Sequence, residues 1–95
     1  MNYKYAFIAL GNYDVKKVNA SLDNGNFKVF GVKSIDEAIE ISNKLIDDGI
    51  NFIELCGAFE KEGAKKVIDG TKNRVPIGFI GYLSEQEDLL KEVFG

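Results

Sequence analysis

Four segments rich in β-forming residues begin at nearly even intervals along the chain, and this spacing restricts the fold more than any other feature. They open at Tyr3, Phe27, Phe52 and Ile77, so successive starts lie 24, 25 and 25 residues apart. A strand, a crossover helix and two short loops need about that length. The period therefore predicts βα units, whose strand ends and following loops share one edge of a sheet, where ligands usually bind.

These segments predict an α/β fold with four βα units and a mostly parallel four-stranded sheet. The sheet is expected to be an open sandwich or a half-barrel completed by oligomerisation. Tyr3–Leu10 is apolar on both faces apart from Lys4, as expected of a strand that is covered on both sides.

Three helices follow from apolar residues at helical spacing. Two begin with S-x-x-E capping boxes, formed by Ser34 with Glu37 and by Ser84 with Glu87. Another ends near Gly70. The apolar stripes expected for these helices are Ile35, Ala38, Ile39, Ile41, Leu45 and Ile46, then Ala64, Val67 and Ile68, then Leu89, Leu90, Val93 and Phe94.

Residues 14–22 allow two interpretations. Val15, Val18 and Leu22 have helical spacing, and Asp14 could cap the first turn. The cluster Asp23–Asn26 would instead suit a hairpin turn, because Asn-Gly readily adopts positive φ angles. The spacing favours the helix, with the hairpin as the alternative.

Composition limits both the partners and the chemistry. A single domain of 95 residues buries only about 60–65% of its extended surface, so we expect a homo-oligomer that gains burial by association. The net charge is -3 and the basic residues are scattered, which argues against nucleic acid as a partner. Met1–Leu10 does not resemble a signal peptide and no apolar run reaches 18 residues. We therefore expect a cytoplasmic protein that does not enter a membrane.

The chain contains no histidine and one cysteine. Catalysis by Ser-His-Asp or Cys-His, imidazole metal sites, an internal disulfide and a Cys-rich zinc site are therefore excluded. Carboxylates, lysines, tyrosines, one thiol and backbone amides remain. We expect no metal and no cofactor.

The loops after the predicted strands contain the candidate ligand-binding residues. Glycine at these positions lets the backbone turn sharply or lets a ligand approach the main chain, although ordinary loop geometry is the simpler explanation. The candidates are Gly11, Asn12, Tyr13, Gly57, Phe59, Gly81 and Tyr82.

Glu54 and Cys56 are the candidate catalytic residues. Glu54 is the one carboxylate in an otherwise apolar strand, on the same face as Cys56. A buried glutamate must be paired or protonated, and either state suits a general acid or base. A salt bridge to Lys4, or an inter-subunit contact, is the alternative for Glu54. An inert buried thiol is the alternative for Cys56.

The chain resembles a family of small bacterial proteins of unknown function over nearly its whole length. The residues that carry the likeness are Ile53–Phe59, Gly63-Ala64, Val75–Gly78, Tyr5–Ile8, Gly11, Tyr13-Asp14 and Gly25–Phe27. The resemblance implies a compact α/β domain and brings no activity with it.

A shorter segment, Ala38–Leu55, is similar to the second helix and following strand of the keto-deoxy-phosphogluconate aldolases, which are (βα)₈ barrels. Glu54 falls on their catalytic glutamate. No later strand supplies a Schiff-base lysine, so the aldolase activity is not carried over.

Three functions fit these observations. The favoured one is an oligomeric small-molecule-binding or accessory module with its pocket at the strand ends. The second is a small lyase or isomerase that uses Glu54 for proton transfer. The third is a structural interaction protein that presents Phe59, Leu83 and Phe94 to a partner.

Overall fold

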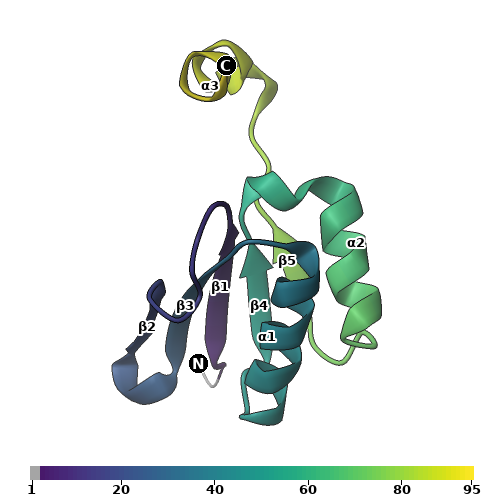
Figure 1. The fold of residues 1–95 in the computed structure, drawn as a ribbon. Helices are drawn as coiled ribbons and strands as arrows, with labels where there is room; N and C mark the ends of the chain where they lie inside the picture. Colours follow the sequence, from purple (N-terminus) through teal and green to yellow (C-terminus); the bar gives the residue numbers. More distant parts are fainter. Residues whose placement is uncertain (1–2) are drawn as a thin grey trace.

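The computed structural model describes residues 3–95, and in this range five strands form one sheet with helices beside and beyond it (Figure 1). The strands are β1 (Tyr5–Leu10), β2 (Asn19–Leu22), β3 (Phe27–Val32), β4 (Phe52–Leu55) and β5 (Ile77–Phe79). The α-helices are α1 (Ile35–Asp47), α2 (Glu60–Gly70) and α3 (Glu87–Phe94). Short 3₁₀ turns are η1 (Asp23–Gly25), η2 (Gly57–Phe59) and η3 (Ser84–Gln86).

The strand order is β2-β3-β1-β4-β5, and all neighbours are parallel except β2, which runs antiparallel to β3. The prediction of a mostly parallel α/β sheet is confirmed. The predicted count of four strands is wrong, because β2 adds a fifth. A half-barrel would place each parallel strand beside the next one along the chain, whereas β1 lies between β3 and β4. The half-barrel alternative is therefore not confirmed.

The favoured helix over residues 14–22 is wrong, and the hairpin alternative is correct. Asn19–Leu22 pairs with β3, with Ala20 opposite Val29. Asn24 and Gly25 have φ angles of 55° and 86°, which turn the chain between the two strands. Non-local strand pairing therefore outweighs the helical spacing of the apolar residues.

The Ser34 half of the first predicted capping box forms, whereas Glu37 accepts the Lys33 N–H instead of the Ser34 N–H, and the second capping box does not form. The Ser34 hydroxyl accepts a hydrogen bond from the Glu37 N–H at 3.1 Å and so begins α1. Ser84 makes no side-chain cap; it begins η3, and α3 starts at Glu87.

α1 and α2 cover the same face of the sheet (Figure 1). The connections from β3 to β4 and from β4 to β5 run in one direction across the sheet, so right-handed crossovers place both helices on one side. The core lies between these helices and the sheet. Its buried apolar residues are Ala6, Ile8, Val32, Ala38, Leu45, Ile50, Ile53, Leu55, Phe59, Ala64 and Val67.

The connection from β1 to β3 runs in the opposite direction, so a right-handed crossover would place it on the other face. It holds a loop and β2 in place of a helix, and no helix of residues 3–95 covers this face. The expectation that the first strand is covered on both sides is therefore wrong within this chain. We call this surface the open face. Strand register and alternation assign to it Tyr5, Phe7, Ala20, Leu22, Phe27, Val29, Phe52, Glu54 and Gly78.

α3 lies beyond the C-terminal ends of the parallel strands, at the end of an extended segment (Figure 1). We call that edge of the sheet the C-terminal rim. Of the helices in residues 3–95, none combines the length and the apolar character needed to cross a membrane.

Candidate functional site

The C-terminal rim brings together the loops that follow β1, β3, β4 and β5. β1 and β4 are adjacent there, although their connections leave in opposite directions across the sheet. Such a switch point is the usual ligand position in open α/β sheets. Cys56 lies at this point: its N–H donates to the Ile8 carbonyl at 3.0 Å, and its Sγ accepts from the Leu10 N–H at 3.2 Å.

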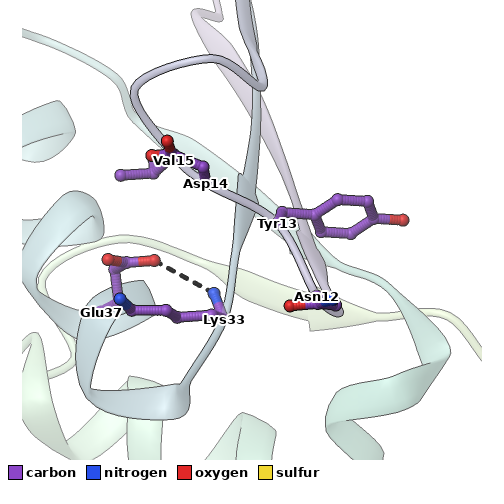
Figure 2. Close-up of a pocket in the computed structure, with 6 residues that line it drawn as sticks. All are labelled: Asn12, Tyr13, Asp14, Val15, Lys33 and Glu37. Atoms are coloured by element: carbon purple, nitrogen blue, oxygen red, sulfur yellow. Dashed lines mark hydrogen bonds between the residues drawn. The ribbon is translucent and has the colours of Figure 1, made fainter.

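A cavity of about 380 Å³ lies at the same rim, on the β3 side of β1, between the loop after β1 and the start of α1. Its lining residues are Asn12, Tyr13, Asp14, Val15, Lys33 and Glu37 (Figure 2). We call it the polar rim pocket. Two of the predicted ligand-binding residues, Asn12 and Tyr13, line it, and the Tyr13 ring points away from Lys33 and Glu37 (Figure 2).

Local hydrogen bonds fix both carboxylates of the polar rim pocket. Glu37 Oε1 accepts the Lys33 N–H at 3.0 Å, as Figure 2 shows. Asp14 Oδ1 accepts the Lys16 N–H at 3.1 Å. The Asp14 carboxylate is therefore held within the loop after β1, and the Glu37 carboxylate of α1 is held by the loop that precedes this helix. The second oxygen of each carboxylate can meet a ligand. Sequence reasoning missed Asp14, Lys33 and Glu37 as lining residues, because Asp14 and Glu37 were interpreted only as helix caps.

Gly11 and Gly31 accommodate the chain's own tyrosine. A Cβ atom at Gly11 would lie 2.8 Å from Tyr13 Cε2, and one at Gly31 would lie 2.8 Å from Tyr13 Cγ and 2.6 Å from Val18 Cγ1. The ring of Tyr13 therefore rests on bare backbone at the end of β1 and β3. The close approach expected of a ligand at Gly11 is made here by an aromatic side chain.

A second cavity, of about 280 Å³, lies at the end of β4 beside α3. Gly57 and Tyr82, two further candidates, line it together with Ala58, Glu60, Leu90 and Phe94. We call it the apolar rim pocket. Tyr82 packs against Gly57, where an added Cβ would lie 3.1 Å from Tyr82 Cε2.

Phe59 and Gly81, like Gly11, are rim candidates that line neither of the two rim pockets. Phe59 is only 3% exposed and belongs to the core beneath α2. An added Cβ at Gly81 would meet no atom within 4 Å, so the segment after β5 is open on that side.

Glu54 lies on the open face and is half-buried. Burial, together with a hydrogen bond to Glu54 and the charge of that carboxylate, raises the pKa of Tyr5 to about 12. Lys4 does not pair with Glu54: its side chain lies against Gly49, at the other end of the strand. The salt bridge considered for Lys4 is therefore absent from the described part of the chain.

Aromatic side chains cluster around Tyr5, and sequence reasoning missed this cluster. The Tyr5 ring lies 5.4 Å from the rings of both Phe27 and Phe52, and Tyr3 lies 6.0 Å from Phe52. The signal was available, because these aromatics occupy the starts of three parallel strands that must be neighbours. Hollows of about 680 Å³ and 440 Å³ flank the cluster.

Within residues 3–95, no group of three or more Cys, Asp or Glu side chains is placed to hold a metal ion. The polar rim pocket itself offers one ammonium, two carboxylates, an amide and the Tyr13 side chain.

Comparison with known proteins gives one match. No curated protein and no solved structure matches the chain, so the partial likeness to the aldolases gains no support. One family model, described as a family of unknown function (DUF6506), matches residues 3–95. The match covers nearly the full sequence, as the resemblance to a family of unknown function implied. The chain belongs to this family, DUF6506.

Proposed function

We propose that this chain is a cytosolic, oligomeric small-molecule-binding or accessory module whose ligand binds at the C-terminal rim. The observation that carries the proposal is the polar rim pocket, with Asn12, Asp14, Lys33 and Glu37 around one cavity. Its volume of about 380 Å³ is in the range of small-ligand sites, which is about 300–1,000 Å³.

The charges of the polar rim pocket suggest the class of ligand. Two carboxylates and one ammonium line it, together with the amide of Asn12. An anion would meet more negative than positive charge, whereas a neutral or zwitterionic molecule could engage both kinds of group. We therefore infer a small, neutral or zwitterionic polar ligand.

The test is an NMR titration of the labelled chain with a panel of small polar metabolites that includes free amino acids, sugars and dicarboxylates. We expect a neutral or zwitterionic member to shift the amide signals of Asn12, Tyr13 and Lys33. Lys33→Ala should abolish those shifts. Lys65→Ala, at an exposed position of α2, is the control and should preserve them. Shifts confined to other regions, or no shifts at all, would contradict a rim site.

The alternative is a small lyase or isomerase with Glu54 as general acid or base. The observation in its favour is the nearness of Glu54 to Tyr5, whose pKa it helps to raise, because two proton-carrying groups then lie together on one surface. Cys56 would be a second participant, and its Sγ is already an acceptor for the Leu10 N–H. An activity that persists unchanged in Glu54→Gln would remove Glu54 from this mechanism.

A further inference from the structure

Two surfaces of this chain lack the partner that their chemistry requires. The open face is a sheet surface of aromatic and aliphatic side chains with no helix of residues 3–95 over it. α3 is an amphipathic helix without a sheet beneath it: Leu89, Val93 and Phe94 are 57%, 75% and 77% exposed. A sheet face and a helix stripe of this kind normally bury each other.

The length of α3 points to docking. It has eight residues, and isolated helices shorter than about 12–15 residues are marginal in water. Its apolar side chains Leu89, Leu90, Val93 and Phe94 lie within one arc of the helix, and of these only Leu90 is half-buried. Leu90 and Phe94 line the apolar rim pocket of their own chain, but Leu89, Val93 and most of Phe94 stay exposed, so the helix needs a further apolar surface.

The segment before α3 directs it away from its own sheet. Ile80 still donates its N–H to the Leu55 carbonyl at 2.9 Å, as a continuation of β5. Tyr82 then packs against Gly57 at the C-terminal rim. Leu83 then leads from Tyr82 into η3, and α3 stands beyond the rim (Figure 1). A terminal helix held away from its domain by an extended hinge is the arrangement found in exchanged dimers.

The open face also carries one charge that needs a partner once it is covered. Glu54 is its carboxylate: it lies opposite Phe7 in the register of β1 and β4, on the same face as Phe52, and near Tyr5. A carboxylate that loses water is costly unless a cation or further hydrogen bonds replace that water. α3 has one basic residue, Lys91, which borders the apolar arc on the side of Phe94. The ammonium of Lys91 is therefore the complementary charge.

We propose that α3 of a second copy of this chain packs on the open face, in a reciprocal exchange that pairs Lys91 of one copy with Glu54 of the other. The inference rests on the oligomeric part of the proposed function and adds the surface and the helix that form the oligomer. The exchange is isologous, so one two-fold axis buries both open faces and both α3 helices. The α3 helix of the second copy would then cover the face of the sheet that the connection from β1 to β3 leaves without a helix.

Sedimentation velocity of the full chain over a range of concentrations tests the exchange. We expect the chain of 10.5 kDa to sediment as a dimer. Val93→Glu should raise the dimer dissociation constant by about tenfold or more, because it places a carboxylate in the apolar contact. Glu92→Gln, on the polar side of the same helix, is the matched control and should leave the constant unchanged. Circular dichroism should show equal folding, because Val93 is 75% exposed in the chain itself.

Charge reversal identifies the partners. Lys91→Glu alone should weaken the dimer, and Lys91→Glu combined with Glu54→Lys should restore it. A monomeric wild-type chain would overturn the exchange. A dimer whose dissociation constant is unchanged by Val93→Glu would also overturn the exchange, but it would leave the oligomeric part of the proposed function intact. Both results are independent of the NMR titration, so a failure of the rim site and a failure of the exchange are distinguishable.

Discussion

The Tyr5 side chain and the Glu54 carboxylate lie together on the open face of the sheet, on adjacent parallel strands, and the carboxylate adds to the effect of burial in raising the pKa of Tyr5. This pair is the polar centre of an otherwise aromatic surface formed by Tyr5, Phe27 and Phe52. Because the negative charge of Glu54 disfavours the tyrosinate form, Tyr5 keeps its proton to higher pH. The pair also marks the position where a covering helix would have to supply a cation.

Tyrosine titration tests this pair. Burial and Glu54 raise the pKa of Tyr5 from 10.0 to about 12, so the folded chain holds this proton more tightly than the unfolded chain does. The resulting stabilisation is fully present below pH 10 and is lost as the pH rises towards 12. Absorbance of tyrosinate should show a late step that disappears in Tyr5→Phe and moves to lower pH in Glu54→Gln. Tyr82→Phe, at an exposed side chain, should leave the late step in place. A single step near pH 10 for all tyrosines would contradict the pairing.

Gly31 should tolerate no side chain. In Gly31→Ala the new methyl group would lie 2.6 Å from Val18 Cγ1 and 2.8 Å from Tyr13 Cγ. We expect a loss of about 1–3 kcal/mol in the free energy of unfolding, measured by urea denaturation. Gly81→Ala is the matched control, because its methyl group would meet no atom within 4 Å. Equal stability of the two variants would show that Tyr13 and Val18 do not rest on β3.

The two predicted capping boxes should differ in mutational cost. Ser34→Ala removes the acceptor for the Glu37 N–H and should lower the free energy of unfolding by about 1 kcal/mol. Ser84→Ala removes no cap and should cost less than about 0.5 kcal/mol. Thermal or urea unfolding monitored by circular dichroism measures both. A larger loss for Ser84→Ala would mean that α3 begins with a cap at that residue.

The ion pair of Arg74 with Asp47 should contribute more to the free energy of unfolding than the pair of Lys44 with Glu40, which is the other ion pair within residues 3–95. Its guanidinium donates to Asp47 Oδ1 at 2.9 Å and to Asn43 Oδ1 at 2.8 Å, and so ties the loop after α2 to α1. Arg74→Ala should cost about 1 kcal/mol in unfolding free energy, a figure reduced by solvent at its partly exposed partners. Lys44→Ala breaks only an exposed pair to Glu40, 3.5 Å long, and serves as the reference. Similar losses for both variants would contradict the tie between α1 and the loop.

The sequence predicted the parallel strands well, because each one lies in a short segment rich in apolar and aromatic residues. It did not predict β2. All four residues of Asn19–Leu22 are exposed at a sheet edge, and their pairing with β3 is a non-local interaction that no local pattern reveals. The helical spacing of Val15, Val18 and Leu22 was therefore misleading.

The rim was predicted in part. Strand ends located Asn12, Tyr13, Gly57 and Tyr82, which line the two rim pockets. Phe59 could not be separated from them, because its burial depends on how α2 packs after the turn η2. The open face could not be predicted from the sequence for a related reason. Tyr5 and Phe7 are apolar in the same way as residues that are covered, and the sequence does not show whether the cover comes from the same chain.

Native mass spectrometry of the full chain as purified tests the dimer and the rim site together, since one spectrum reports the number of subunits and any retained small molecule. We expect a dimer of the 10.5 kDa chain that carries the added mass of a small polar ligand. Lys33→Ala should remove the added mass and keep the dimer, whereas Val93→Glu should yield monomers. A bare monomer for the wild-type chain would contradict the account.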